Sequence, residues 1–230
     1  MPTRKRAFLS GARAVSPILL GVIPFAMIAG IAAIKVGFTK LEALGMSYIV
    51  FAGAAQLAAI DLIGRHAPVA IVILTALIIN LRFFMYSASL APHFNGLPLR
   101  GRGLLAYLLT DQAYAISIAA YSGERRSLKH WFYFGAALTL WGVWQTSTAV
   151  GVFLGGQIPQ SWSLDFAIPL TFLALLFPTI RNRPSLAAAI SAGALALAAH
   201  RLPYNLGLLL AALGGIIVGC LAEGRGKDVA

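Results

Sequence analysis

Two charged residues stand inside apolar stretches of this chain, and their types suggest a paired chemistry. Arg82 lies within LIINLRFFMYSASL (residues 77–90), and Asp111 lies within YLLTDQAYAIS (107–117). A charged side chain at the centre of a membrane costs about 2.5–3.5 kcal/mol and normally faces protein or a water-filled cavity. Pairing would neutralise both groups, and a carboxylate at that depth could also carry a proton. Three interpretations of Arg82 stay open: a structural ion pair, a contact with a substrate carboxylate, or a shifted segment boundary.

Three amides accompany these charges and are candidates for the same site. Gln56 lies in FAGAAQLAA (51–59), whose small residues allow close helix approach, and a buried amide needs hydrogen-bond partners. Asn80 precedes Arg82 by two residues, which places the two side chains about 200° apart on a regular helix. They can line one site only if the helix is unwound near them. Gln112 follows the aspartate directly.

Prolines within apolar stretches predict broken helices. Pro24 and Pro169 each remove a backbone hydrogen bond from a helix. The freed carbonyl groups can bind an ammonium, and an exposed helix N-terminus can bind a carboxylate. Phe25 and Phe83 are candidates for the apolar wall of such a site. The alternative is that these prolines only kink their helices.

The composition indicates an integral membrane protein. Of 230 residues, 59% are hydrophobic and 11% charged, whereas soluble domains carry about 25% charged residues. The mean hydropathy is +0.82. The net charge of +11 comes from basic residues scattered over short loops, which argues against nucleic acid as a partner.

The residue types also argue against catalysis and against a bound metal or cofactor. Cys220 is the sole cysteine, which excludes an intramolecular disulfide or a cysteine metal cluster. The four histidines lie at the ends of apolar runs, as interfacial histidines do. No phosphate-binding, hydrolase or zinc-protease motif is present, so we expect no enzyme activity.

Hydropathy predicts an all-α bundle of about seven to eight transmembrane segments in one domain, residues 1–230. A short basic stretch (1–13) precedes the segments and a polar tail (223–230) follows them. The sixth and seventh segments are short for a hydrocarbon core that needs about 20 residues, so they could be half-helices. The eight candidates are 14–34, 43–63, 67–91, 104–121, 131–155, 165–180, 184–200 and 205–222.

The distribution of basic residues predicts the orientation. With eight spans and the N-terminus inside, 12 of the 18 Lys and Arg residues fall on the cytoplasmic side. Such an excess is the usual sign of cytoplasmic loops. We therefore expect both termini inside, unless the span count is odd. The outer side then holds Lys35, Lys40, Arg100, Arg102 and Arg201.

The two halves of the chain share a faint order of motifs. An offset of five spans would place the copies in opposite orientations, as in the inverted repeats of many transporters. Chance similarity in a sequence rich in Ala, Gly and Leu is the alternative. The pairs are GVIPFAMIAG with FAIPLTFLAL, FAGAAQLA with SAGALALA, and INLRFF with YNLGLL.

Several motifs follow one another in a fixed order along the chain: G-x-x-P-F (21–25), S-x-x-V-F-A-G-A-A-Q (47–56), I-N-L-R-x-x-x-Y-S-A-S-L-A-P (79–92), L-T-D (109–111) and LDFAIPLTFLAL (164–175). Together these motifs resemble the AzlC family of branched-chain amino acid transport proteins. The resemblance implies a multi-pass protein of the bacterial inner membrane that exports branched-chain amino acids. It also implies a small membrane partner of the AzlD type. The family often continues L-T-D with glutamate, whereas this chain has Gln112, which leaves Asp111 as the candidate proton carrier.

The sequence thus favours a secondary transporter that exports branched-chain or hydrophobic amino acids, coupled to an ion or proton gradient. In this hypothesis Gln56 and Asn80 contact the zwitterion or hold the site, and Arg82 binds the carboxylate or holds Asp111. The alternative function is a non-transporting membrane subunit that stabilises a partner permease.

Overall fold

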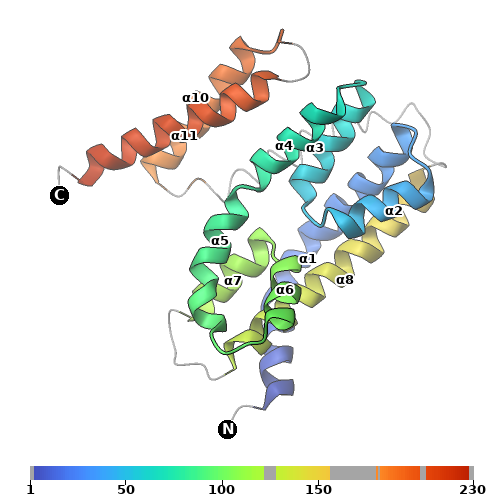
Figure 1. Ribbon diagram of the computed structural model, residues 1–230, viewed down its shortest axis with the longest axis vertical. Helices are drawn as coiled ribbons and strands as arrows, with labels where there is room; N and C mark the ends of the chain where they lie inside the picture. The colour runs from blue at the N-terminus through green and yellow to red at the C-terminus, as the bar shows by residue number, and fades with distance from the viewer. Residues whose placement is uncertain (1–2, 122–127, 156–179, 181, 203–205, 228–230) are drawn as a thin grey trace. The chain divides into compact units, whose positions relative to one another are not determined.

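The computed structural model describes residues 3–121, 128–155, 180, 182–202 and 206–227, and these are helical without a β-strand. The predicted all-α class is therefore confirmed. Two compact units are present, 1–60 with 79–162 and 61–78 with 163–230, and each is described by itself. The elements (Figure 1) are α1 (Arg4–Lys35), α2 (Lys40–Ile49), α3 (Gly53–Gly64), α4 (Val69–Asn80), α5 (Arg82–Leu90), the 3₁₀ turn η1 (Ala91–Phe94), α6 (Leu99–Tyr107), α7 (Asp111–Tyr121), α8 (Lys129–Gly155), α10 (Arg183–Ala198) and α11 (Leu206–Lys227).

Fewer helices can span a membrane than hydropathy predicts. Within the described residues three are long and apolar enough: Arg4–Lys35, Val69–Phe94 and Leu206–Glu223, or four if the bent pair α6 and α7 counts as one span. The predicted span 43–63 is divided between α2 and α3, and 104–121 is divided between α6 and α7. The predicted sixth segment, with Pro169, lies almost wholly outside the described residues.

The first unit is built on close parallel packing of α1 and α8. Glycines on each helix contact the backbone of the other, and the residue numbers of both helices increase in the same direction along the contact. Small residues let two helix backbones approach in this way. The contacts join Gly11 to Phe132, Phe8 to Gly135, Met27 to Gly151 and Gly30 to Thr148.

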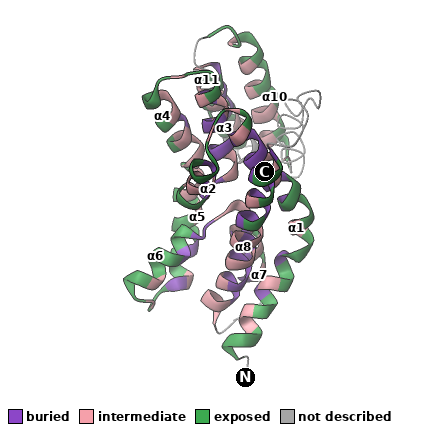
Figure 2. Ribbon diagram, turned by 90° about the vertical axis from the view of Figure 1, so that its right-hand side faces the viewer, coloured by how far each residue is buried: buried purple, intermediate pink, exposed green. Residues whose placement is uncertain are grey.

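α8 is the central helix of this unit, although its hydropathy falls below that of the candidate spans. Gln145, Ser147 and Thr148 are polar and lower its mean hydropathy, but all three are buried. Figure 2 shows the buried residues of α8 in purple. A helix whose polar residues face protein does not need an apolar surface all round.

α2 begins near the C-terminal end of α8 and runs towards its middle. Lys40 at the start of α2 lies over the ring of Phe153, with 5.1 Å from Nζ to the ring centroid. One turn before its end, the Ser47 hydroxyl donates to Oε1 of Gln145 at 2.9 Å and accepts from Nε1 of Trp144 at 3.1 Å. Thr39 and Glu42 form a capping box at the start of the helix, and these hydrogen bonds lower the pKa of Glu42.

α6 and α7 form a hairpin that starts and finishes at the opposite end of α8. Their axes are bent by 118° at Leu108–Thr110. His93, just before this pair, lies 3.2 Å from Nζ of Lys129 and 4.9 Å from the ring of Tyr121, the last residue of α7. A pair that crossed a hydrocarbon core of about 30 Å would hold these residues far apart. The predicted crossing at 104–121 is therefore wrong.

In the second unit α10 and α11 pack as an antiparallel pair through small residues. Gly207 contacts Ala199, Gly215 contacts Ala192 and Gly219 contacts Ala188, so the residue numbers of the two helices change in opposite directions. Asn182 and Ser185 form a capping box that starts α10.

The glycine packing predicts a sharp difference between two alanine substitutions on α8. A Cβ at Gly151 would overlap the backbone of Met27, whereas one at Gly142 would meet nothing within 4 Å. We expect Gly151→Ala to destabilise the protein by about 1–3 kcal/mol, as overpacking does, and Gly142→Ala to be neutral or slightly stabilising. Thermal unfolding in detergent measures both. Equal unfolding midpoints for the two variants would contradict the close parallel pair.

The hairpin predicts which residues share a side of the membrane. In a Cys220→Ser background, single cysteines at Lys5 and Asn95 should react with an impermeant thiol reagent from one side, and a cysteine at Lys35 from the other. Labelling of sealed vesicles of known orientation measures this. Labelling of Asn95 together with Lys35, as expected for a simple span at 104–121, would refute the hairpin.

Candidate functional site

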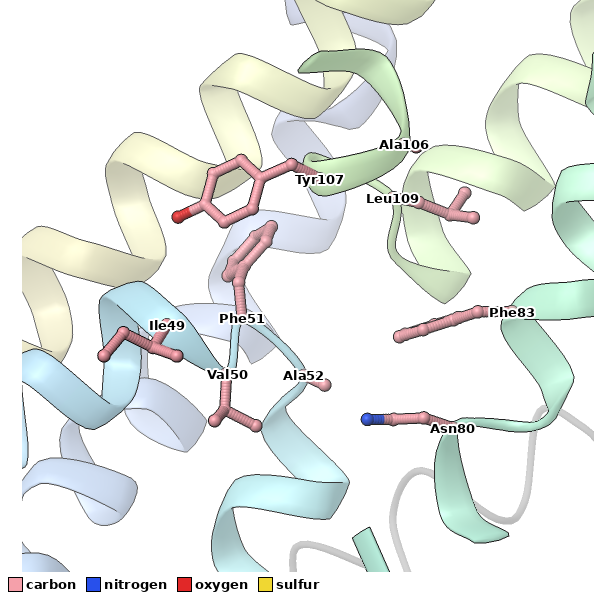
Figure 3. Close-up of a pocket in the computed structure, with 9 residues that line it drawn as sticks. All are labelled: Ile49, Val50, Phe51, Ala52, Asn80, Phe83, Ala106, Tyr107 and Leu109. Carbon is pink, nitrogen blue, oxygen red and sulfur yellow. The ribbon is translucent and has the colours of Figure 1, made fainter. Parts of the chain in front are cut away.

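Interruptions in three helix pairs line one cavity of the first unit. The cavity has a volume of about 230 Å³. One side is formed where α2 gives way to α3, another by the turn between α6 and α7, and a third where the α4–α5 helix loses its regular hydrogen bonding at Leu81 (Figure 3). The lining residues are Ile49, Val50, Phe51, Ala52, Asn80, Phe83, Ala106, Tyr107 and Leu109.

These interruptions bring helix ends to the cavity. Each one places the C-terminus of one helix next to the N-terminus of the following helix. The last carbonyl groups of a helix carry partial negative charge and the first amides carry partial positive charge. The cavity therefore combines an apolar wall with backbone groups suited to an ammonium and to a carboxylate.

Arg82 and Asp111 form an ion pair beside this cavity. Nη2 of Arg82 lies 3.1 Å from Oδ2 of Asp111, and the side chains are 31% and 38% exposed within the chain. Asp111 is the first residue of α7, a position that favours a carboxylate, and Arg82 directly follows the irregular turn at Leu81. Nε of Arg82 is buried without a hydrogen-bond partner and remains a free donor.

Tyr86 also holds Asp111, and sequence reasoning missed this residue. Its hydroxyl donates to Oδ1 of Asp111 at 3.0 Å, so both carboxylate oxygens are engaged. The Tyr86 ring stacks on Tyr114, with centroids 4.3 Å apart, and the Tyr114 hydroxyl donates to Ser89 at 3.2 Å. Tyr86 follows Arg82 by four residues, and that spacing on a helix could have indicated a shared face.

Asn80 lines the cavity, and the irregular turn at Leu81 separates it from Arg82. Figure 3 shows its amide nitrogen directed into the cavity towards Ala52. Its Oδ1 is buried without a partner. The helix is not unwound between these two residues: Leu81 keeps helical dihedral angles, and Val69–Phe94 continues as one 26-residue helix with a single irregular turn.

The other predicted residues lie apart from the cavity lining. Gln56 is fully buried, and both its amide atoms lack a hydrogen-bond partner. Phe25 packs on Trp144, with ring centroids 5.5 Å apart, and belongs to the core rather than to the cavity. Gln112 is the second residue of α7 and does not line the cavity.

The helix break predicted at Pro24 does not occur. α1 continues as one helix of 32 residues through Pro17 and Pro24. Its contacts with α8 on both sides of the prolines hold the helix in place, and the other peptide groups keep their hydrogen bonds. The prediction for Pro169 lies outside the described residues. Elsewhere in the described part of the chain, no three His, Cys, Asp or Glu residues gather to hold a metal.

Comparison with known proteins gives consistent matches. The model of the AzlC protein family matches residues 17–158. An uncharacterised membrane protein of Archaeoglobus fulgidus is 36% identical over 86% of this chain and 88% of its own. The inner membrane protein YgaZ of Escherichia coli is 30% identical over 93% and 88%. The branched-chain amino acid transport protein AzlC of Bacillus subtilis is 26% identical over 74% and 66%. No solved structure gives a significant match.

The ion pair predicts coupled effects of substitution on stability. Arg82→Leu and Asp111→Asn should each lower the unfolding midpoint in detergent, because each leaves a charge without its partner. The double variant should recover part of the loss, with a coupling energy of about 0.5–3 kcal/mol. Arg65→Leu is the matched control, since its pair with Asp61 is exposed and such pairs contribute little. Purely additive losses, with no recovery in the double variant, would argue against a stabilising pair.

Proposed function

Because the chain belongs to the AzlC family of membrane proteins, we propose that it is a secondary transporter that exports branched-chain amino acids. The observation that carries this proposal is the meeting of three helix interruptions at one small cavity. Interrupted helices of this kind form the substrate sites of many secondary transporters.

The lining suits a zwitterion with an aliphatic side chain. The free Nε donor of Arg82, the Asn80 amide and the helix N-termini would receive the carboxylate. The helix C-terminal carbonyls would receive the ammonium. Ile49, Val50 and Leu109 would enclose a branched side chain. A volume of about 230 Å³ fits one small molecule rather than a peptide.

Asp111 is the proposed coupling group. A substrate carboxylate would take its place on Arg82 and release Asp111 from the ion pair. Gln112 cannot take part in proton transfer, so one carboxylate would carry the coupling.

The N-terminal end is proposed to be cytoplasmic, in a bacterial inner membrane. Because α6 begins at the Lys129 end of α8, Arg100 and Arg102 share that end with the basic start of α1. Lys35 and Lys40 lie at the other end. This bias is stronger than the one predicted with Arg100 and Arg102 outside. A small AzlD-type membrane protein is the proposed partner.

Export from loaded cells tests the transport function. Cells that make the chain with such a partner should release labelled leucine, isoleucine and valine several-fold faster than cells without the chain. Asn80→Ala should reduce this rate at least tenfold, whereas Asn95→Ala, the same substitution at an exposed turn, should not. Equal release with and without the chain would refute the proposal. Purified chain in liposomes separates the alternatives: transport without a partner excludes a purely stabilising subunit.

A further inference from the structure

α2 and α6 approach the middle of α8 from opposite ends, and Tyr107 joins them where they meet. Figure 1 shows α2 beside the C-terminal half of α8 and α6 beside its N-terminal half. The Tyr107 hydroxyl donates to the carbonyl oxygen of Tyr48 at 2.7 Å and accepts from Nε1 of Trp141 at 3.0 Å. Trp141 lies close to the midpoint of α8.

The acceptor in this bond is a carbonyl that the end of α2 leaves without its helical partner. Tyr48 lies in the last turn, where the residue four positions on is Ala52. The amide of Ala52 bonds instead to the carbonyl of Val50. An unpaired carbonyl inside a membrane protein is costly, so the Tyr107 hydroxyl satisfies a need created by the interruption itself.

Tyr107 is also part of the cavity wall. Its ring packs beside Phe51 with centroids 6.2 Å apart, and both residues line the cavity (Figure 3). The Trp141 ring packs on Tyr48 at 5.6 Å. One phenol therefore connects the end of α2, the end of α6 and the rigid α8 at the edge of the proposed substrate site.

Two glycines on the α6 side of this contact have open space beside them. Gly96, in the turn before α6, has φ of +91°, and neither it nor Gly103 has a neighbour that a Cβ would meet within 4 Å. The base of the hairpin is held by His93, Lys129 and Tyr121, and α6 is also held to α8 by the bond from the Tyr133 hydroxyl to the carbonyl of Leu105 at 2.9 Å. Motion of the end of α6 beyond Leu105 would separate Tyr107 from Tyr48.

We propose that Tyr107 is a positioning residue that latches the ends of α2 and α6 together, and that release of this latch opens the cavity during transport. The inference rests on the proposed function, because it makes the hairpin of α6 and α7 the moving part of the transporter. In this proposal the cavity opens towards an end of α8 only when α2 or α6 moves away from the middle of α8.

Cysteine accessibility in the full chain tests the latch. In a Cys220→Ser background, a cysteine at Ala52, which lines the cavity and is 6% exposed, reports on its opening. With Tyr107→Phe, a water-soluble methanethiosulfonate should modify this cysteine about tenfold faster in native membranes. Tyr48→Phe is the matched control: it removes a hydroxyl from the same cluster but keeps the carbonyl acceptor, and should leave the rate unchanged.

A second variant guards against simple misfolding. Trp141→Phe removes the donor to Tyr107 while retaining an aromatic ring. It should raise the modification rate of the Ala52 cysteine by a smaller factor than Tyr107→Phe does, and it should lower the unfolding midpoint less than Tyr107→Phe does. Saturating leucine should slow modification in the parent. Unchanged rates in both Tyr107→Phe and Trp141→Phe would overturn the latch even if export is intact. Faster modification in a chain that exports none of the three amino acids would support the latch and refute the proposed substrate.

Discussion

The rest of the first unit depends on the contact between α1 and α8. Glycines on both helices bring the two backbones together over most of their length, and no side chain can be added at these positions without separating the helices. The pair gives a rigid parallel frame. α2 attaches to it through Ser47, and α6 attaches through Tyr107 and through Tyr133, which donates to the carbonyl of Leu105 at 2.9 Å. Each attachment uses the polar residues or aromatic donors of α8.

Interrupted helices need such donors, because hydrocarbon offers no water to their free peptide groups. The carbonyl of Tyr48 at the end of α2 and that of Leu105 near the end of α6 each accept from a tyrosine hydroxyl. Aromatic donors suit this role, since their rings add to the apolar packing while the polar atom reaches the carbonyl. The structure therefore keeps these two helix ends at the cavity with the carbonyls of Tyr48 and Leu105 paired.

The charged residues beside the cavity are also paired with groups from other helices. Arg82 and Asp111 stand at the starts of two different helices and meet at one point, with Tyr86 completing the shell of the carboxylate. The pair keeps two ionised groups inside the membrane domain, and neither is deeply buried within the chain. A group that is held but still accessible can exchange its partner.

The sequence predicted some residues of the candidate site and missed others. Composition was enough to indicate a helical membrane protein, and the isolated charges in apolar stretches were enough to suggest the Arg82–Asp111 pair. Asn80, a candidate from the sequence, lines the cavity, and its contact with a substrate stays a prediction. Tyr86 and Tyr107 were missed, since tyrosines in apolar segments usually indicate nothing more than packing or the membrane interface.

The count of spans was wrong for a physical reason. Hydropathy reports how apolar a stretch is but not the direction in which it runs, so a hairpin such as α6 and α7 has the same composition as a crossing helix. Direction is decided by contacts between distant residues, here His93 with Lys129 and Lys40 with Phe153. The sequence by itself determined that this protein lies in a membrane and which of its charged residues need partners there. Only the tertiary structure decided where the helices are interrupted and what meets there, because the ends of α2 and α6 are stabilised by hydrogen bonds from another part of the chain.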